Sequence, residues 1–255
     1  INVCTEKPMA TRWDKGLEMV EACEKAGISL FVVKQNRFNK TLKLLKKQID
    51  KGRFGQIAMI NSNVFWQRPQ EYYDQDQWRG TWEFDGGALM NQASHYVDLL
   101  GWIGGPVECI NASIATIGRR IEVEDTAALR LKWRNGALGT MAVTMLTYPK
   151  NLEGSIMVLG EKGTAKIGGT ALNKIEVWEF KDVSEDDDLL NDSNYEIDNI
   201  YGDGHSGYYS NMINSLLGKE KAICDGREGL KSLELLIAAY RSSRDGNTIH
   251  LPLKF

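Results

Sequence analysis

The tripeptide Glu6–Lys7–Pro8 places a lysine beside a proline near the beginning of the sequence. A residue that precedes proline is disfavoured in a helix, so Lys7 is expected in extended backbone at a turn. A lysine fixed there could direct its ammonium group into a cleft and hydrogen-bond a substrate hydroxyl, and desolvation would lower its pKa. Most such tripeptides are surface turns, so this one is a weak indication by itself.

The segment Gly86–Trp102, GGALMNQASHYVDLLGW, carries polar residues within an apolar, helix-like pattern. In a helix over 87–103, Asn91 and His95 share one face and Asp98 lies beside them. A neutral imidazole there could accept a hydroxyl proton while the carbon gives up hydride, and the carboxylate would fix its tautomer. The alternative is that His95 merely packs against a sheet. The three histidines show no metal-ligand spacing, so no metal site is expected.

The loop ahead of this helix, WRGTWEFDGG, combines Arg79 with two tryptophans. Arginine suits bidentate recognition of phosphate or carboxylate, so the loop could bind an anionic ligand. A packed aromatic loop is the equally weighted alternative. The sequence contains no GxSxG elbow, no P-loop and no CxxC pair, which weakens hydrolase, phosphotransferase and thiol-redox interpretations.

The first 36 residues read as strand, helix and strand. The run INVCTEKP is strand-like, TRWDKGLEMVEACEKA has helical spacing, and ISLFVVKQN is the continuous apolar run of a buried parallel strand. The tripeptide EKP and the segment KQNRFN, residues 34–39, then follow two parallel strands at their carboxyl ends. Ligands bind at this edge in open α/β sheets.

The residue pattern changes from helical to strand-like after a helix predicted over 39–51. Successive strand-like runs from 56 to 180 alternate polar and apolar residues, with a hairpin turn at Asn135–Gly136. They predict one large, mostly antiparallel sheet, with the 87–103 helix between its first and second strands. The acidic segment 182–192 is predicted as a solvated loop, and 207–218 and 227–246 as helices before an extended tail.

The charge and cysteine content narrow the class of protein. Thirty-one Lys and Arg against 34 Asp and Glu give a net charge of −3, which favours neither a nucleic-acid nor a membrane partner. The four cysteines are far apart and are interpreted as reduced thiols. There is no signal segment and no apolar run of spanning length, so we expect a soluble, cytoplasmic protein.

Taken in order, CTEKP, VVKQNRFN and DGGALMNQASHYVDLL resemble the Gfo/Idh/MocA family of nicotinamide-dependent sugar oxidoreductases, over essentially the whole sequence. The resemblance implies an α/β plus α+β fold, in which the C-terminal remnant of a doubly wound Rossmann sheet joins a large, open, mostly antiparallel sheet with helices on one face. Residues 1–36 would belong to the dinucleotide-binding domain and 37–255 to a substrate-binding and oligomerisation domain, with 226–255 packing back on the Rossmann part.

Within the family, KQNR, WRGTW and MNQASHYVDLL are most similar to enzymes that oxidise the C3 hydroxyl of UDP-N-acetylglucosaminuronic acid, a precursor of surface polysaccharides such as lipopolysaccharide. The resemblance implies NAD as cofactor, with NADP left open, and Lys7 and His95 as catalytic residues. It implies cofactor contacts by Glu6, Lys7, Pro8, Gln35, Trp78 and Arg79. It implies substrate contacts by Lys7, Arg37, Asn39, Asn91, Gln92 and His95. Because many members have Asp where this chain has Asn91, the base would be His95, or Lys7 acting with it.

The Gly-rich turn that opens the family's dinucleotide-binding domain is not in this sequence. We therefore expect the sequence to lack the N-terminal part of that domain. One alternative is a non-catalytic fragment that serves as an oligomerisation sheet, and another is a family member that acts on an inositol or a simple aldose. In either case we expect a homo-oligomer, a dimer or tetramer formed through the large sheet.

Overall fold

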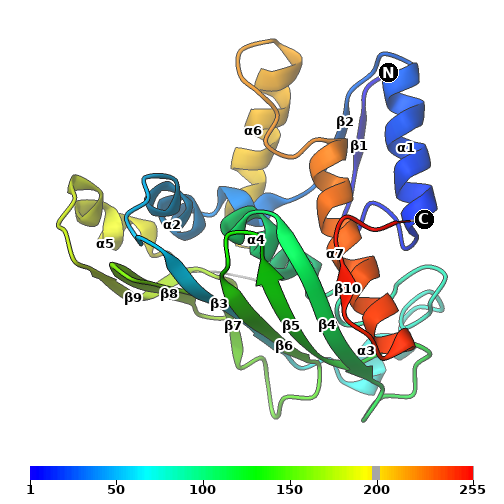
Figure 1. The fold of residues 1–255 in the computed structure, drawn as a ribbon. Helices are drawn as coiled ribbons and strands as arrows, with labels where there is room; N and C mark the ends of the chain where they lie inside the picture. Colours follow the sequence, from blue (N-terminus) through cyan, green and yellow to red (C-terminus); the bar gives the residue numbers. More distant parts are fainter. Residues whose placement is uncertain (197–201, 255) are drawn as a thin grey trace.

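The computed structural model describes residues 1–196 and 202–254. A two-stranded parallel sheet with its helix stands beside a large eight-stranded sheet. Helices α4 (Ser94–Gly104) and α7 (Gly226–Asp245) lie over one side of the large sheet (Figure 1). One hydrophobic core runs through both parts, from Val20 and Val32 to Ile156 and Ile167. The predicted fold class, a small parallel α/β unit joined to a large and mostly antiparallel sheet, is confirmed.

The small sheet contains β1 (Val3–Thr5) and β2 (Leu30–Val32), which α1 (Trp13–Lys25) connects. The two strands are parallel, with Val3 opposite Leu30. All three residues of β2 are buried, which explains its continuous apolar sequence. The predicted strand–helix–strand unit is confirmed.

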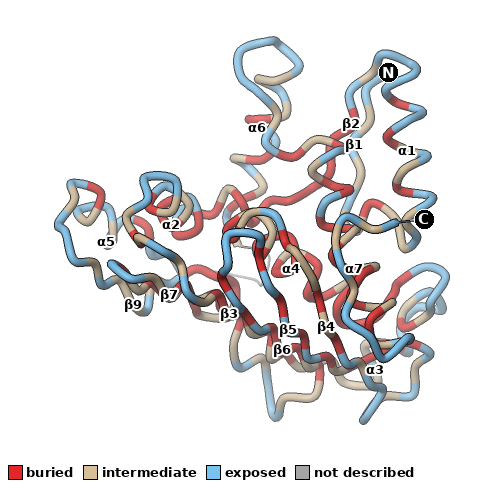
Figure 2. The backbone as a smooth tube through the Cα atoms, in the orientation of Figure 1, coloured by how far each residue is buried: buried red, intermediate tan, exposed pale blue. Residues whose placement is uncertain are grey.

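The large sheet has the strand order β10-β4-β5-β6-β3-β7-β8-β9, and among these pairs only β3 and β6 are parallel. Burial alternates along β5 and β6, so one face of the sheet is packed and the other is open (Figure 2). The strands are β3 (Ile57–Phe65), β4 (Val107–Ala115), β5 (Thr126–Trp133), β6 (Leu138–Thr144), β7 (Glu153–Gly160), β8 (Gly163–Gly168), β9 (Lys174–Phe180) and β10 (Ile249–His250).

Helices α4 and α7 join the two sheets. Gly16 of α1 lies so close to Leu233 of α7 that an added Cβ would be 2.5 Å from its Cδ2, and Gly229 of α7 is equally close to Val32 of β2. Trp133 of β5 is completely buried, and its indole N–H donates to the Leu100 carbonyl of α4. The helices are η1 (Gln35–Phe38), α2 (Lys40–Asp50), α3 (Gln70–Asp74), α4 (Ser94–Gly104), η2 (Glu185–Leu189), α5 (Leu190–Ser193), α6 (Gly204–Leu216) and α7 (Gly226–Asp245).

The prediction of a helix over 87–103 is wrong for its first turns, because α4 begins only at Ser94. Residues 85–93 form turns that the buried Glu124 holds. Its carboxylate accepts the Leu89 N–H at 2.8 Å and its carbonyl accepts the Ala88 N–H at 2.9 Å. Gly87 leaves room for this carboxylate, since a Cβ there would lie 1.7 Å from Oε2. Asn91 and Gln92 therefore lie on a turn, not on the face of a helix.

The acidic segment 182–192 is mostly exposed, as its composition predicts, but it is not a loop throughout. It contains η2 and α5, and Ser184 caps η2 through a capping box with Asp187. Asp186 is only 6% exposed and accepts at 2.6 Å from Lys47 of α2 and from Lys51, the residue after that helix. The carboxylates of Asp186 and Asp187 are therefore paired with basic side chains more than 100 residues away in the sequence.

The four cysteines are free thiols, as predicted. Among the described helices, none has the length and apolar character that crossing a membrane requires. Within residues 1–196 and 202–254, no three His, Cys, Asp or Glu side chains gather in a group that could hold a metal ion.

Candidate active site

Lys7 lies just after β1, and a chain of polar contacts orients its side chain. Its ammonium nitrogen donates to the Asn91 carbonyl at 2.9 Å and to Asn91 Oδ1 at 3.3 Å. The amide of Asn91 donates in turn to Asp85, which also accepts the Gly80 N–H at 2.6 Å. The turn before α4 therefore presents two hydrogen-bond acceptors to Lys7, and these position its ammonium group.

Burial lowers the pKa of Lys7 from 10.5 to about 8. The carboxylates of Glu6 and Asp85 oppose this change, and the positive charge of Lys34 adds to it. A lysine with this pKa exchanges a proton near neutral pH, so it can serve as an acid or as a base in catalysis.

His95 lies in the first turn of α4 and meets Gln35, which follows β2. The amide nitrogen of Gln35 is 3.2 Å from His95 Nε2, and Nδ1 has no hydrogen-bond partner among the described residues. Burial, together with the charges of Lys7 and Lys34, lowers the pKa of His95 well below 6.5, so the imidazole is neutral. With the amide nitrogen as donor, Nε2 accepts and the ring proton lies on Nδ1.

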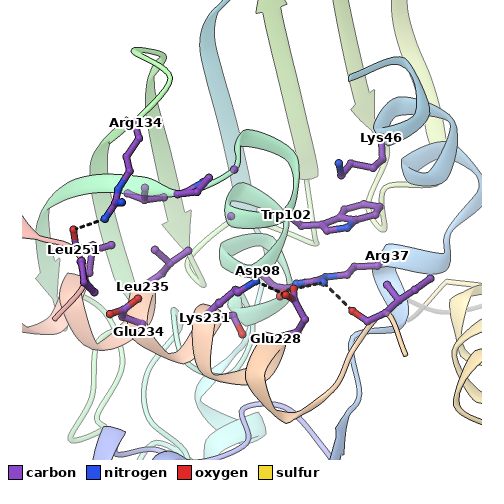
Figure 3. Close-up of a pocket in the computed structure, with 17 residues that line it drawn as sticks. Arg37, Lys46, Asp98, Trp102, Arg134, Glu228, Lys231, Glu234, Leu235 and Leu251 are labelled. Carbon is purple, nitrogen blue, oxygen red and sulfur yellow. Dashed lines mark hydrogen bonds and ion pairs between the residues drawn. The ribbon is translucent and has the colours of Figure 1, made fainter. Parts of the chain in front are cut away.

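The expectation that Asp98 lies beside His95 and fixes its tautomer is wrong. Asp98 instead binds Arg37 in a bidentate pair, with Nε at 2.8 Å and Nη2 at 2.7 Å, and Lys34 Nζ is 3.8 Å away. Arg37 also donates to Glu228 of α7 at 2.9 Å, as Figure 3 shows. Arg37 and Lys34 hold the Asp98 carboxylate away from His95, and Gln35 is the residue next to the imidazole.

Five of the predicted site residues surround one small pocket of about 80 Å³. They are Lys7, Gln35, Asn91, Gln92 and His95. Glu6 and Pro8 are the chain neighbours of Lys7. Because two candidate catalytic groups and three amide side chains enclose this space, it can hold a carbinol and the groups next to it.

The other predicted residues do not line this pocket. Arg37 is 4% exposed and borders a separate cavity of about 570 Å³ beside Trp102 and Lys46 (Figure 3). Asn39 is buried, and both polar atoms of its amide lack partners among the described residues. Arg79 stacks on Trp78 and donates to the Tyr72 hydroxyl at 2.7 Å. Because Tyr72 lines the pocket, Arg79 and Trp78 lie one layer behind it.

Several pocket residues were missed by the sequence analysis. Trp66, Arg68 and Tyr72, which follow β3, line the pocket with Asn36 and Tyr96. The available signal was an arginine among four aromatic residues at the end of a strand-like run, FWQRPQEYY. His205 of α6 was also missed, although it contributes to the low pKa of His95.

Comparison with known proteins adds independent information. The model of the Gfo/Idh/MocA oxidoreductase family, C-terminal alpha/beta domain, matches residues 46–251. The crystal structure of the WlbA dehydrogenase from Chromobacterium violaceum, in complex with NADH and UDP-GlcNAcA, is 60% identical with a TM-score of 0.95, and the match covers 100% of this chain and 72% of that one. The WlbA dehydrogenase from Bordetella pertussis, in complex with the same two ligands, is also 60% identical, with a TM-score of 0.96 and coverage of 99% and 73%.

More distant curated relatives include the 2,7-anhydro-N-acetylneuraminate hydratase of Escherichia coli, which is 26% identical over 86% of this chain and 62% of its own length. The 1-carboxy-3-chloro-3,4-dihydroxycyclohexa-1,5-diene dehydrogenase of Comamonas testosteroni is 26% identical over 63% of this chain. The chain spans 41% of that protein's length. The family model matches more than half of the chain, so the chain belongs to the Gfo/Idh/MocA oxidoreductase family.

The buried ion pair gives a testable prediction. Asp98→Asn leaves Arg37 and Lys34 without their shared buried carboxylate, which costs about 3–5 kcal/mol in comparable cases. Urea denaturation should show a loss of this size. Asp14→Asn, which breaks the exposed pair with Arg12, is the matched control and should change stability little. Equal effects of the two substitutions would contradict the importance of the buried pair.

Proposed function

We propose that this protein oxidises a hydroxyl of a UDP-sugar to a ketone with NAD as cofactor, and that the substrate is UDP-N-acetylglucosaminuronic acid, oxidised at C3. The observation that carries the proposal is the shared pocket of Lys7 and His95. It lies in a chain that is 60% identical, over its whole length, to a dehydrogenase that was crystallised with NADH and UDP-GlcNAcA.

The residues next to the pocket suit a nicotinamide cofactor, which supplies the hydride acceptor when bound. Glu6, Lys7, Pro8 and Gln35 follow the carboxyl ends of parallel strands, where such ligands bind in open α/β sheets. Gln35 is 2% exposed, and its Oε1 has no partner among the described residues. An unsatisfied buried acceptor suits a ligand that brings hydrogen-bond donors, such as a carboxamide.

We assign proton transfer to Lys7. Its ammonium group has a pKa of about 8, so a substantial neutral fraction can take the proton of the C3 hydroxyl as the C3–H bond breaks. Asn91 orients the lysine, and the Nδ1–H of His95 donates to the same substrate oxygen. Gln92, which lines the pocket, contributes a further substrate contact. The contacts inferred for Arg37, Asn39, Trp78 and Arg79 stay predictions.

Two wider assignments accompany the proposal. Residues 1–36 belong to a dinucleotide-binding domain and 37–255 to a substrate-binding and oligomerisation domain, with 226–255 packed back on the first. The close approach of Gly229 to Val32 supports this packing. We place the reaction in the cytoplasm, in the supply of precursors for surface polysaccharides such as lipopolysaccharide.

The open face of the large sheet supports a homo-oligomer. Ala128, Arg130 and Lys132 of β5, together with Leu138 and Thr140 of β6, are exposed on it. Two copies can cover this face by packing sheet against sheet. A monomer in sedimentation equilibrium at micromolar concentration would contradict the assembly and leave the catalytic proposal standing.

The substrate is tested by turnover of the protein expressed from its complete reading frame. With NAD, UDP-N-acetylglucosaminuronic acid should produce NADH, followed by its absorbance, while myo-inositol and D-xylose should produce none at equal concentration. Turnover of the inositol or the aldose in preference to the sugar nucleotide would contradict the substrate assignment.

The role of Lys7 predicts a pH dependence. Because the neutral amine is the active form and its pKa is about 8, kcat should rise about tenfold per pH unit below pH 8 and level off above it. Lys7→Met should reduce kcat about 100-fold or more and abolish the rise. Lys15→Met, at an exposed position of α1, is the control and should keep the profile. A profile that falls above pH 8 in the parent protein would exclude Lys7 as the base.

A further inference from the structure

Arg68 borders the pocket of Lys7 and His95 and is held in one orientation. Its Nη1 donates to the Gln67 carbonyl at 2.6 Å and to Asn151 Oδ1 at 3.3 Å. Its guanidinium carbon lies 5.3 Å from the ring centre of Trp66 and 5.4 Å from that of Tyr72. Two aromatic rings and two hydrogen bonds therefore fix the plane of the guanidinium group before any ligand arrives.

The other edge of the Arg68 guanidinium group is unused. Nε and Nη2 have no hydrogen-bond partner among the described residues, and no carboxylate there forms an ion pair with Arg68. By contrast, Arg37 and Arg53 each bind an aspartate in bidentate geometry. Arg119 adds positive charge nearby, since its Nε donates to the Arg68 carbonyl at 2.6 Å.

Other buried groups of the pocket also lack partners. The indole N–H of Trp66, which is 6% exposed, has none among the described residues, and neither has Nδ1 of His95. Buried polar atoms of a folded chain are nearly always satisfied, so unpartnered ones around a single pocket indicate a polar ligand. The guanidinium group of Arg68 is positively charged, and its Nε and Nη2 are free to donate two hydrogen bonds. The ligand that it binds is therefore negatively charged.

We propose that Arg68 binds the C6 carboxylate of the uronic acid and thereby selects the acidic sugar nucleotide over its neutral counterpart. This inference rests on the proposed function and adds the specificity-determining residue. A planar carboxylate matches the free edge with two parallel N–H···O bonds. The pocket, at about 80 Å³, is far smaller than the roughly 300–1,000 Å³ of a site for a whole ligand. It therefore holds the reacting end of the sugar, while the diphosphate and uridine lie outside it.

The test compares the binding of three ligands to the protein expressed from its complete reading frame, with NADH saturating so that no oxidation occurs. The ligands are UDP-N-acetylglucosaminuronic acid, UDP-N-acetylglucosamine and UDP, and calorimetry gives each Kd. Arg68→Met should weaken binding of the acid about 10- to 100-fold and change the other two less than about threefold. Arg68→Lys, which keeps the charge without the fork, should show an intermediate loss for the acid alone.

Arg120→Met is the matched control, because it removes an exposed arginine near α3 and should leave all three Kd values unchanged. Equal weakening of all three ligands by Arg68→Met would assign Arg68 to the diphosphate and overturn the proposal, as would unchanged binding of the acid. If Arg68→Met does not fold, Arg68→Lys decides on the same criteria. A parent protein that binds no sugar nucleotide would refute the proposed function itself, whereas normal parent binding with an unaffected variant refutes only this inference.

Discussion

The buried ion pair between Arg37 and Asp98 is the interaction on which the geometry of the site depends. It ties η1, which follows β2, to the second turn of α4, and Glu228 extends the connection to α7. Gln35 lies two residues before Arg37, and His95 lies three residues before Asp98. Because both ends of the ion pair are fixed, Gln35 and His95 meet at 3.2 Å. Charges buried in this way are costly to separate, so the two elements stay in register.

The same arrangement sets the electrostatics of the pocket. Lys34 is completely enclosed near Asp98, and its positive charge lowers the pKa of both Lys7 and His95. Burial acts in the same direction on both groups. The result is a neutral imidazole and a lysine that titrates near pH 8, two states that suit removal of a proton from an alcohol. The amide of Asn91 orients Lys7 without adding a charge.

Local patterns in the sequence predicted the strand–helix–strand unit, the large sheet and the placement of EKP and KQNRFN at one sheet edge, because each depends on a short run of residues. Contacts between distant segments could not be read in this way. The start of α4 depends on Glu124, which lies 30 residues beyond Ser94, and the partner of Asp98 lies 61 residues before it. The acidic segment acquired structure from Lys47 and Lys51. The stretch FWQRPQEYY offered a local signal for Arg68, but its place between Trp66 and Tyr72 at the pocket depends on the folded chain.

The measurement that tests the central claim most directly follows the hydrogen at C3. The protein, expressed from its complete reading frame, is incubated with NAD and UDP-N-acetylglucosaminuronic acid that carries deuterium only at C3, and the mass of the NADH formed is determined. Hydride transfer from C3 predicts NADH that is heavier by the mass of one deuterium substitution. NADH of unlabelled mass would show that the hydride leaves another carbon, and the absence of NADH would contradict the assignment of this substrate.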